Sequence, residues 1–173
     1  MSSVPAGIEI RTEQSEDHAS VRRVNELAFG QRAEADLVEA LRAGGHARLS
    51  LVAEEAGEIV GHVLFSDLPI VDGIRTIPAL ALAPLAVVPE RQRRGVGSAL
   101  VREGLRRSAE SGYEAVVVLG HPAYYPRFGF SAQLAAHLAA PYAGEAFMAA
   151  ELVPGALAGV AGAVRYPPPF DGV

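Results

Sequence analysis

One stretch of the chain, from Ile77 to Leu119, constrains the fold more than any other. Ile77–Val88 is nearly uninterrupted in apolar character, as in a strand buried on both faces. After Pro89 the apolar residues recur with the period of a helix, which Gly112 ends; they are Val96, Leu100, Val101, Leu105 and Ala109. Ala115–Leu119 is again apolar over the length of a strand. This order of strand, turn, helix and strand predicts a crossover unit with two parallel strands.

The flanking segments predict further strands and helices. A short strand is expected over Ile8–Thr12, followed by a helix that Ser15 or Asp17 caps and Gly30 ends. Its apolar face holds Val21, Val24, Leu27 and Ala28, and a second helix presents Ala33, Leu37, Val38 and Leu41. Ala56-Gly57 predicts a hairpin turn between strands over Leu49–Glu54 and Glu58–Phe65. Later elements are a short helix over Pro122–Arg127 and strands over Phe147–Leu152 and Ala163–Tyr166, and Pro167–Pro169 is expected to end the ordered chain.

The size of the chain predicts one domain. It has 173 residues, of which 50% are hydrophobic and 20% charged, and it contains no repeat or low-complexity linker. The fold class expected from these patterns is α/β with mixed strand directions. Pro84 lies inside the strand expected over Ile77–Val88 and lacks the N–H that a ladder needs, so we expect a bulge or splay there.

Composition excludes several classes of function. The chain has no cysteine, which excludes disulfide scaffolds, thiolate zinc sites and thiol nucleophiles. Its net charge of −5 argues against a general nucleic-acid-binding protein. No apolar run reaches the roughly 18–20 residues of a membrane span, and the first residues do not resemble a secretory signal, so we expect a cytoplasmic protein with no membrane association.

The basic residues, all arginine, concentrate between Arg91 and Arg107. A basic patch on an acidic protein indicates a small anionic ligand, and a solvated helix face is the alternative. Gly95 and Gly97 open the predicted helix there and let a ligand approach the backbone amides, which predicts a pyrophosphate site. The loop lacks the Lys-Ser/Thr pair of a Walker loop, and Leu100 stands where the dinucleotide fingerprint has a small residue. The sequence therefore favours neither a nucleoside triphosphate nor NAD as the ligand.

Two motifs in this region match one known family. Gln92-Arg93-Arg94-Gly95-Val96-Gly97 resembles the Gln/Arg-x-x-Gly-x-Gly/Ala signature of the GNAT superfamily of acetyl-CoA-dependent N-acetyltransferases. Downstream, Tyr124–Phe130 resembles the family's Tyr-x-x-x-Gly-Phe segment. The resemblance runs from about residue 8 to residue 130, and the C-terminal strands and tail, 131–173, look like the YhbS-like bacterial branch.

The resemblance implies a single-domain fold with a central, mostly antiparallel sheet, a splayed parallel strand pair and flanking helices. It implies acetyl-CoA as co-substrate and transfer of acetyl to a primary amine of a small molecule or peptide, by direct attack in a ternary complex. A non-catalytic acyl-CoA sensor or interaction module is the alternative, and a longer acyl donor stays open.

The cofactor residues carried over from the family fall on two neighbouring segments. Backbone groups of the splayed strand would pair with the pantetheine arm, and here they are Leu85, Ala86 and Val87. Loop amides would cradle the pyrophosphate, and here they are Gln92, Arg93, Arg94, Gly95, Val96, Gly97 and Ser98. Arginine side chains, Arg91 included, can add bonds to phosphate oxygens at the rim, with solvation as the alternative.

The family's tyrosine maps to Tyr125, whose phenol would protonate the departing thiolate; Tyr124 is the alternative. Phe128 and Phe130 are expected in the core. For the general base we single out His121, because it follows the strand Ala115–Leu119 at its carboxyl end. A strand-end histidine bonded to backbone is the alternative, and Glu26 and Asp67 are further candidates. The other histidines show no metal-ligand spacing, so we expect no metal; they are His18, His46, His62 and His137.

The acceptor and the assembly are less constrained by the sequence. The acidic charge favours cationic amines, and Asp67, Glu145 and Glu151 are candidates for lining their pocket. The apolar segment Leu134–Val164 is expected either in the core or at the face of a homodimer.

Overall fold

The structure is a computed structural model and describes residues 4–142 and 144–172. Residues 1–3 belong to the N-terminal stretch in which no secretory signal is expected, and they lie outside the described residues. The helices are α1 (His18–Phe29), α2 (Ala33–Ala43), α3 (Val96–Glu110) and α4 (Ala132–Ala135), with 3-10 turns η1 (Ser15–Asp17), η2 (Pro89–Arg91), η3 (Tyr125–Phe128) and η4 (Pro168–Gly172). The strands are β1 (Ile8–Thr12), β2 (Ala47–Glu55), β3 (Glu58–Asp67), β4 (Ile70–Asp72), β5 (Arg75–Ile77), β6 (Ala79–Val87), β7 (Ala115–Leu119), β8 (Phe147–Glu151) and β9 (Ala163–Val164).

Hydrogen bonds join six strands into a mixed sheet in the order β1-β2-β3-β6-β7-β8. The predicted parallel pair is β6 and β7, in register from Ala79↔Ala115 to Ala81↔Val117. Strands β1 and β2, like β7 and β8, are antiparallel. The prediction of a mixed, mostly antiparallel sheet with one parallel pair is therefore confirmed. Pro84, which has no N–H for a ladder, lies three residues beyond the last pair of that register.

The backbone divides into two compact units, each made of separate stretches of chain. The first unit consists of Met1–Phe65, Pro84–Gly104 and Pro168–Val173, and the second of Ser66–Ala83 and Leu105–Pro167.

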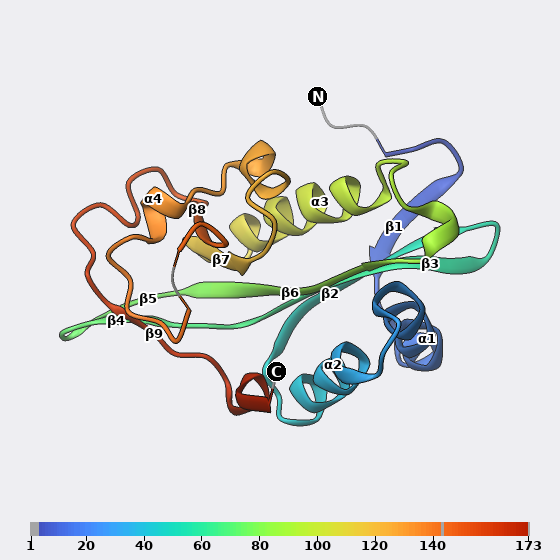
Figure 1. The fold of residues 1–173 in the computed structure, drawn as a ribbon, viewed down its shortest axis with the longest axis horizontal. Helices are drawn as coiled ribbons and strands as arrows, with labels where there is room; N and C mark the ends of the chain where they lie inside the picture. Colours follow the sequence, from blue (N-terminus) through green and yellow to red (C-terminus); the bar gives the residue numbers. More distant parts are fainter. Residues whose placement is uncertain (1–3, 143, 173) are drawn as a thin grey trace. The chain divides into compact units, whose positions relative to one another are not determined.

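In the first unit, helices cover both faces of the sheet. Figure 1 shows α1 and α2 on one side of β1–β3 and the beginning of α3 on the other. Strand β3 explains how both contacts arise, because its successive residues point to opposite faces. A Cβ on Gly61 would lie 3.0 Å from Leu100 of α3, whereas His62 lies 3.2 Å from Asn25 of α1. A strand covered on both faces is buried along its length, and in β3 every residue from Ile59 to Ser66 is buried.

The turn between β2 and β3 is the predicted one. Ala56 and Gly57 have φ angles of 51° and 82°, as the two central residues of a type I′ hairpin turn require.

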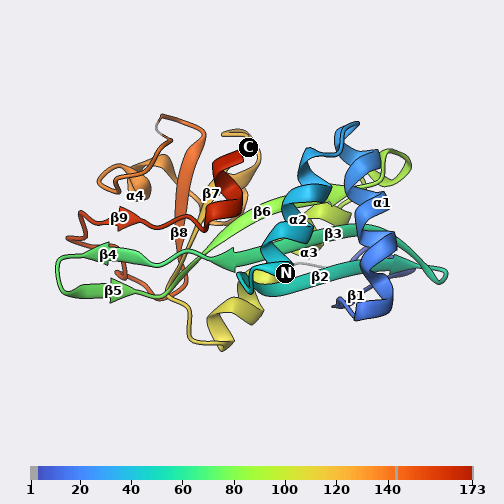
Figure 2. The ribbon, with the colours of Figure 1, turned by 90° about the horizontal axis from the view of Figure 1, so that it is seen from below.

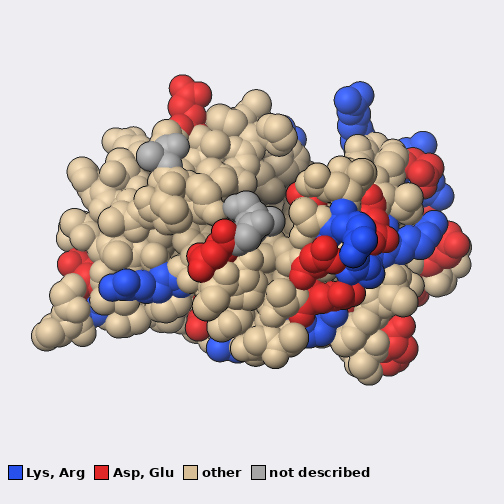
Figure 3. All heavy atoms as spheres, turned by 60° about the horizontal axis from the view of Figure 1, so that its bottom comes forward, with Lys and Arg blue, Asp and Glu red and all other residues tan. Residues whose placement is uncertain are grey.

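Helix α1 buries a different face from the one predicted. Val21 and Val24 are buried, but Leu27 is 42% exposed, so its assignment to the apolar face is wrong. Asn25, one turn after Val21, lies in the buried stripe instead. Arg22 pairs with Glu26 within α1 and joins α1 to α2 through ion pairs with Asp36 and Glu39. Figure 3 shows arginine and carboxylate side chains interleaved over these helices.

The proline-rich tail also differs from the prediction. The expected end of ordered structure at Pro167–Pro169 is wrong, because η4 continues to Gly172 and contacts α2. Phe170 is only 7% exposed, and burial of an aromatic ring is a sufficient reason for the tail to stay attached.

The second unit contains a small sheet that the sequence patterns did not reveal. Strand β4 pairs with both β5 and β9, all antiparallel, and Figure 2 shows the three side by side. The β4–β5 hairpin turns at Gly73-Ile74, between the paired residues Asp72 and Arg75, and Gly73 has a φ angle of 62°. The long strand predicted from Ile77 begins at Ala79, because Pro78 separates β5 from β6.

The late elements of this unit are shorter than expected. Strand β9 ends at Val164, β8 ends at Glu151, and the helix expected over Pro122–Arg127 is the 3-10 turn η3. Over residues 4–142 and 144–172, no helix combines the length and hydropathy needed to cross a membrane.

Candidate active site

The glycine loop of the first unit has the backbone of an anion site. Arg93 and Gly95 both have left-handed backbones, with φ angles of 65° and 87°, and α3 begins directly after them. The amide of Ala99 donates to the carbonyl of Gly95 at 3.0 Å. The amides of Val96 and Gly97 come before that bond, in the first turn of the helix, for which a helix supplies no carbonyl of its own. A helix start of this kind attracts negative charge.

The loop has an exposed rim and one buried side chain that anchors it. The rim consists of Gln92, Arg93, Arg94 and Gly95, which are all exposed. Val96 is 2% exposed and packs on β3, where a Cβ on Gly61 would lie 3.1 Å from it. Two exposed guanidinium groups beside helix-start amides suit a diphosphate, so the residues present fit the phosphate end of acetyl-CoA.

The strand segment that precedes the loop alternates in burial. Ala86 is 1% exposed, whereas Leu85 and Val87 are half-buried. The side chain of Gln92 donates to the carbonyl of Val87 at 2.9 Å, which ties the loop back to this strand.

Arg91 lies differently from the other loop arginines. Its guanidinium pairs with Glu55 at the end of β2 through a short contact between Nε and Oε1. This pair raises the pKa of Arg91 above its ordinary value, mainly through the hydrogen bond. The sequence predicted that Arg91 binds phosphate oxygens or is solvated, and it gave no indication of the pair with Glu55.

In the second unit, Tyr125 is packed among aromatic rings. It is 8% exposed and makes edge-on contacts with the rings of Tyr124, Phe128 and Phe130 at centroid distances of 5.1, 6.2 and 5.7 Å. Burial, with a smaller contribution from Tyr124, raises the pKa of the Tyr125 phenol above its ordinary value. A Cβ on Gly120 would lie 2.3 Å from the ring of Tyr125, so a glycine is needed beneath it. Sequence reasoning missed Gly120, although a glycine at a strand end signals a close approach.

His121 lies next to Tyr125 in this unit. Its carbonyl accepts hydrogen bonds from the amides of Tyr124 and Tyr125, at 3.0 and 3.3 Å, while the residue itself is exposed. The structure thus brings the two predicted catalytic residues together in one turn after β7. Of the expected core rings here, Phe130 is buried at 2% exposure and Phe128 only partly buried.

Two of the remaining polar candidates, Glu26 and Glu151, have local partners. Glu26 pairs with Arg22 at 3.1 Å. Glu151 accepts the amides of Gly155 and Leu157 at 3.1 and 2.9 Å, so its carboxylate caps a turn. In the part of the chain that the structure describes, no three His, Cys, Asp or Glu side chains gather as metal ligands would.

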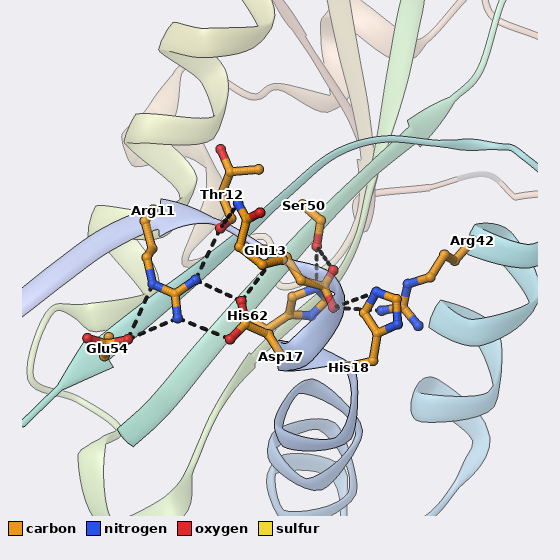
Figure 4. Close-up of polar contacts among 10 residues, drawn as sticks. Arg11, Thr12, Glu13, Asp17, His18, Arg42, Ser50, Glu54 and His62 are labelled. Atoms are coloured by element: carbon orange, nitrogen blue, oxygen red, sulfur yellow. Dashed lines mark hydrogen bonds and ion pairs between the residues drawn. The ribbon is translucent and has the colours of Figure 1, made fainter. Parts of the chain in front are cut away.

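A buried polar cluster around His62 in the first unit was not predicted from the sequence (Figure 4). His62 is fully buried, with Nε2 at 2.9 Å from the hydroxyl of Ser50 and Nδ1 at 3.2 Å from the amide nitrogen of Asn25. Ser50 donates to Glu13 at 2.6 Å, and Arg42 donates to the same carboxylate at 2.7 Å. This polarity makes His62 an acceptor at Nδ1 and a donor at Nε2.

The cluster keeps His62 neutral. Burial, and to a lesser degree the charge of Arg42, lowers the pKa of His62 to about 3. An imidazole that donates toward a serine is not a base for that serine, so the arrangement differs from a nucleophilic triad. The role of the cluster is structural. Asn25 of α1 and Arg42 of α2 are both connected to the sheet through its hydrogen bonds. Close by, Arg11 bridges Asp17 and Glu54 at 2.7 and 2.9 Å and holds the pKa of Asp17 below its ordinary value.

Comparisons with known proteins converge on one family. The model of the "Acetyltransferase (GNAT) domain" matches residues 9–132. The uncharacterized N-acetyltransferase YhbS of Escherichia coli is 40% identical over 167 residues, which cover 94% of this chain and 98% of YhbS. YjhQ of Escherichia coli, also named an uncharacterized N-acetyltransferase, is 44% identical over 116 residues, which cover 66% of this chain and 64% of YjhQ.

Two solved structures resemble the whole chain. The crystal structure of Escherichia coli YhbS in complex with CoA superposes with a TM-score of 0.86 at 36% identity and covers 99% of this chain and 94% of that one. A GNAT family acetyltransferase from Brucella melitensis in complex with acetyl-CoA has a TM-score of 0.79 at 36% identity, with coverage of 95% and 98%.

Proposed function

The chain belongs to the GNAT family of acetyltransferases, and from that membership we propose that it transfers acetyl from acetyl-CoA to a primary amine of a small molecule or peptide. The observation that carries the proposal is the loop whose left-handed residues, Arg93 and Gly95, deliver the start of α3. The binding of CoA by YhbS and of acetyl-CoA by the Brucella protein supports the same co-substrate here.

We assign cofactor binding to two adjacent segments of the first unit. Amides from Gln92 to Ser98 would hold the pyrophosphate, with Arg93 and Arg94 adding charge at the rim. Backbone groups of Leu85, Ala86 and Val87 would pair with the pantetheine arm as an added strand does. The bound co-substrate supplies an acetyl group already activated as a thioester.

The proton-handling residues proposed are Tyr125 and His121. Like any tyrosine, Tyr125 keeps a proton on its phenol oxygen across the neutral range, as a general acid must before it donates. Burial raises the pKa of this phenol and so makes it a weaker acid, which leaves the match to the family's motif as the support for the role. Attack by an amine requires the amine to be neutral, and the exposed imidazole of His121 would accept its proton. Without a cysteine in the chain, no thiol acyl-enzyme can form, which supports direct attack in a ternary complex.

Four further assignments stay predictions. The acceptor is expected to be cationic, with Asp67 and Glu145 left as candidates for its pocket because Glu151 caps a turn. A cytoplasmic location stays an expectation from the sequence. The expected homodimer is tested by analytical ultracentrifugation. The interleaving of the two units along the chain supports one domain over residues 1–173.

The proposal is tested by calorimetric titration with acetyl-CoA, with coenzyme A and ATP as the comparison ligands. We expect micromolar binding of acetyl-CoA and none of ATP, followed by release of free thiol when cationic primary amines are added. A folded sample that ignores acetyl-CoA would refute the proposal. Binding without thiol release across a broad amine panel would favour the acyl-CoA sensor.

A further inference from the structure

The pair formed by Glu55 and Arg91 joins two segments that are far apart in sequence. Glu55 is the last residue of β2, and Arg91 ends the 3-10 turn η2 that leads into the glycine loop. The exposed fractions of the two side chains are 29% and 35%, so neither side chain extends freely into water. Glu55 is followed directly by the hairpin turn, whose two central residues, Ala56 and Gly57, have positive φ angles.

The other bonds near the beginning of the loop run to backbone carbonyls of β3, β6 and the loop itself. The amide of Val88 donates to Val60 of β3 at 2.9 Å, and the amide of Arg91 donates to Val88 at 2.9 Å. Gln92 reaches back to Val87. These contacts fix the end of β6 and the first turn after it. The Glu55 carboxylate adds a side-chain tie from the neighbouring hairpin to Arg91, two residues before the left-handed residue Arg93.

We propose that Glu55 is a positioning residue for the co-substrate: through Arg91 it holds the glycine loop in the conformation that presents its amides to the pyrophosphate. The inference rests on the proposed role of the loop. The direction in which acetyl-CoA affinity changes on removing the Glu55 charge tests this role. By charge alone, a carboxylate beside an anion site would weaken the binding of acetyl-CoA. A positioning role predicts the opposite effect when the charge is removed.

The test compares Glu55→Gln with Glu58→Gln, which removes the same charge from an exposed position on the same hairpin. We expect Glu55→Gln to weaken acetyl-CoA binding about fivefold, the upper range for a half-exposed ion pair. KM for acetyl-CoA should rise by the same factor while kcat at saturation stays unchanged, and Glu58→Gln should bind as well as wild type or better. Glu55→Asp should recover part of the affinity.

Arg91→Gln cuts the same pair from the other side. If Glu55 acts through Arg91, the double variant Glu55→Gln/Arg91→Gln should bind no more weakly than Arg91→Gln alone. Additive losses, or unchanged or tighter binding in folded Glu55→Gln, would overturn the inference. Failure of the wild-type protein to bind acetyl-CoA would count against the proposed function instead, so the two failures are distinguishable.

Discussion

The buried imidazole of His62 makes the stability of the protein depend on pH in a window that can be calculated. The pKa of His62 is about 3 in the folded protein and close to the ordinary 6.5 in the unfolded chain. Between these values the unfolded chain binds a proton that the folded protein does not, so stability is complete above pH 6.5 and falls as the pH decreases. The slope approaches about 1.4 kcal/mol per pH unit, and the loss between pH 7 and pH 5 amounts to about 2 kcal/mol.

This loss is measurable by urea unfolding at a series of pH values. In a thermal scan it corresponds to a decrease in Tm of about 4–8 °C for a chain of this size. His62→Gln removes the titrating group and one hydrogen bond, so it should be less stable than wild type at pH 7 by about 1–3 kcal/mol. Its stability should then change much less between pH 6.5 and pH 5. His137→Gln, at an exposed histidine, is the matched control and should keep the wild-type slope. Equal slopes for His62→Gln and wild type would refute the reasoning.

Other predictions concern the site and the core. Tyr125→Phe removes the phenol proton, so turnover should decrease by about 10²-fold or more with acetyl-CoA affinity nearly intact; a wild-type rate would exclude it as the acid. His121→Ala should flatten the acidic limb of the pH–rate profile. An unchanged acidic limb would exclude His121 as the general base. Gly97→Val should block the approach of pyrophosphate to the loop, measured by calorimetry on a folded variant; wild-type affinity would contradict the assigned cradle. Gly104→Ala places a Cβ 2.2 Å from the ring of Phe65, so it should destabilise the protein by about 1–3 kcal/mol in urea unfolding, and a neutral result would show that the ring can move.

The parts of the fold that could be predicted from sequence are those with local signals. The switch of hydrophobic period at Pro89 predicted β6, α3 and β7 because each period reflects one backbone geometry. The hairpin at Ala56-Gly57 followed from its turn residues. Within the loop, glycines indicated a ligand approach, but the left-handed backbone of Arg93 has no sequence signal, since arginine seldom adopts it.

The features that escaped prediction depend on partners distant in sequence. From the sequence alone, Asn25 would be placed on the polar face of an amphipathic helix. In the structure it is buried because His62, 37 positions later, is its hydrogen-bond partner. Arg91 reads as a phosphate ligand until Glu55 is known to lie against it. Phe170 follows three prolines, and only its contact with another element explains why it is ordered. The hydrophobic period of a helix or strand indicates which of its faces is apolar. It does not identify the distant residues with which its polar side chains form hydrogen bonds.

The interleaving of the two units has a consequence for how the protein is made. The first unit takes its strands from the beginning of the chain, its glycine loop from the middle and η4 from the end of the described chain. While the ribosome is still adding residues, α2 has been synthesised but the turn that carries Phe170 has not. The nascent chain therefore cannot complete its first unit and then move on to the second. Contacts between such widely separated residues close slowly, so we expect folding of the first unit to wait until the turn that carries Phe170 has been synthesised.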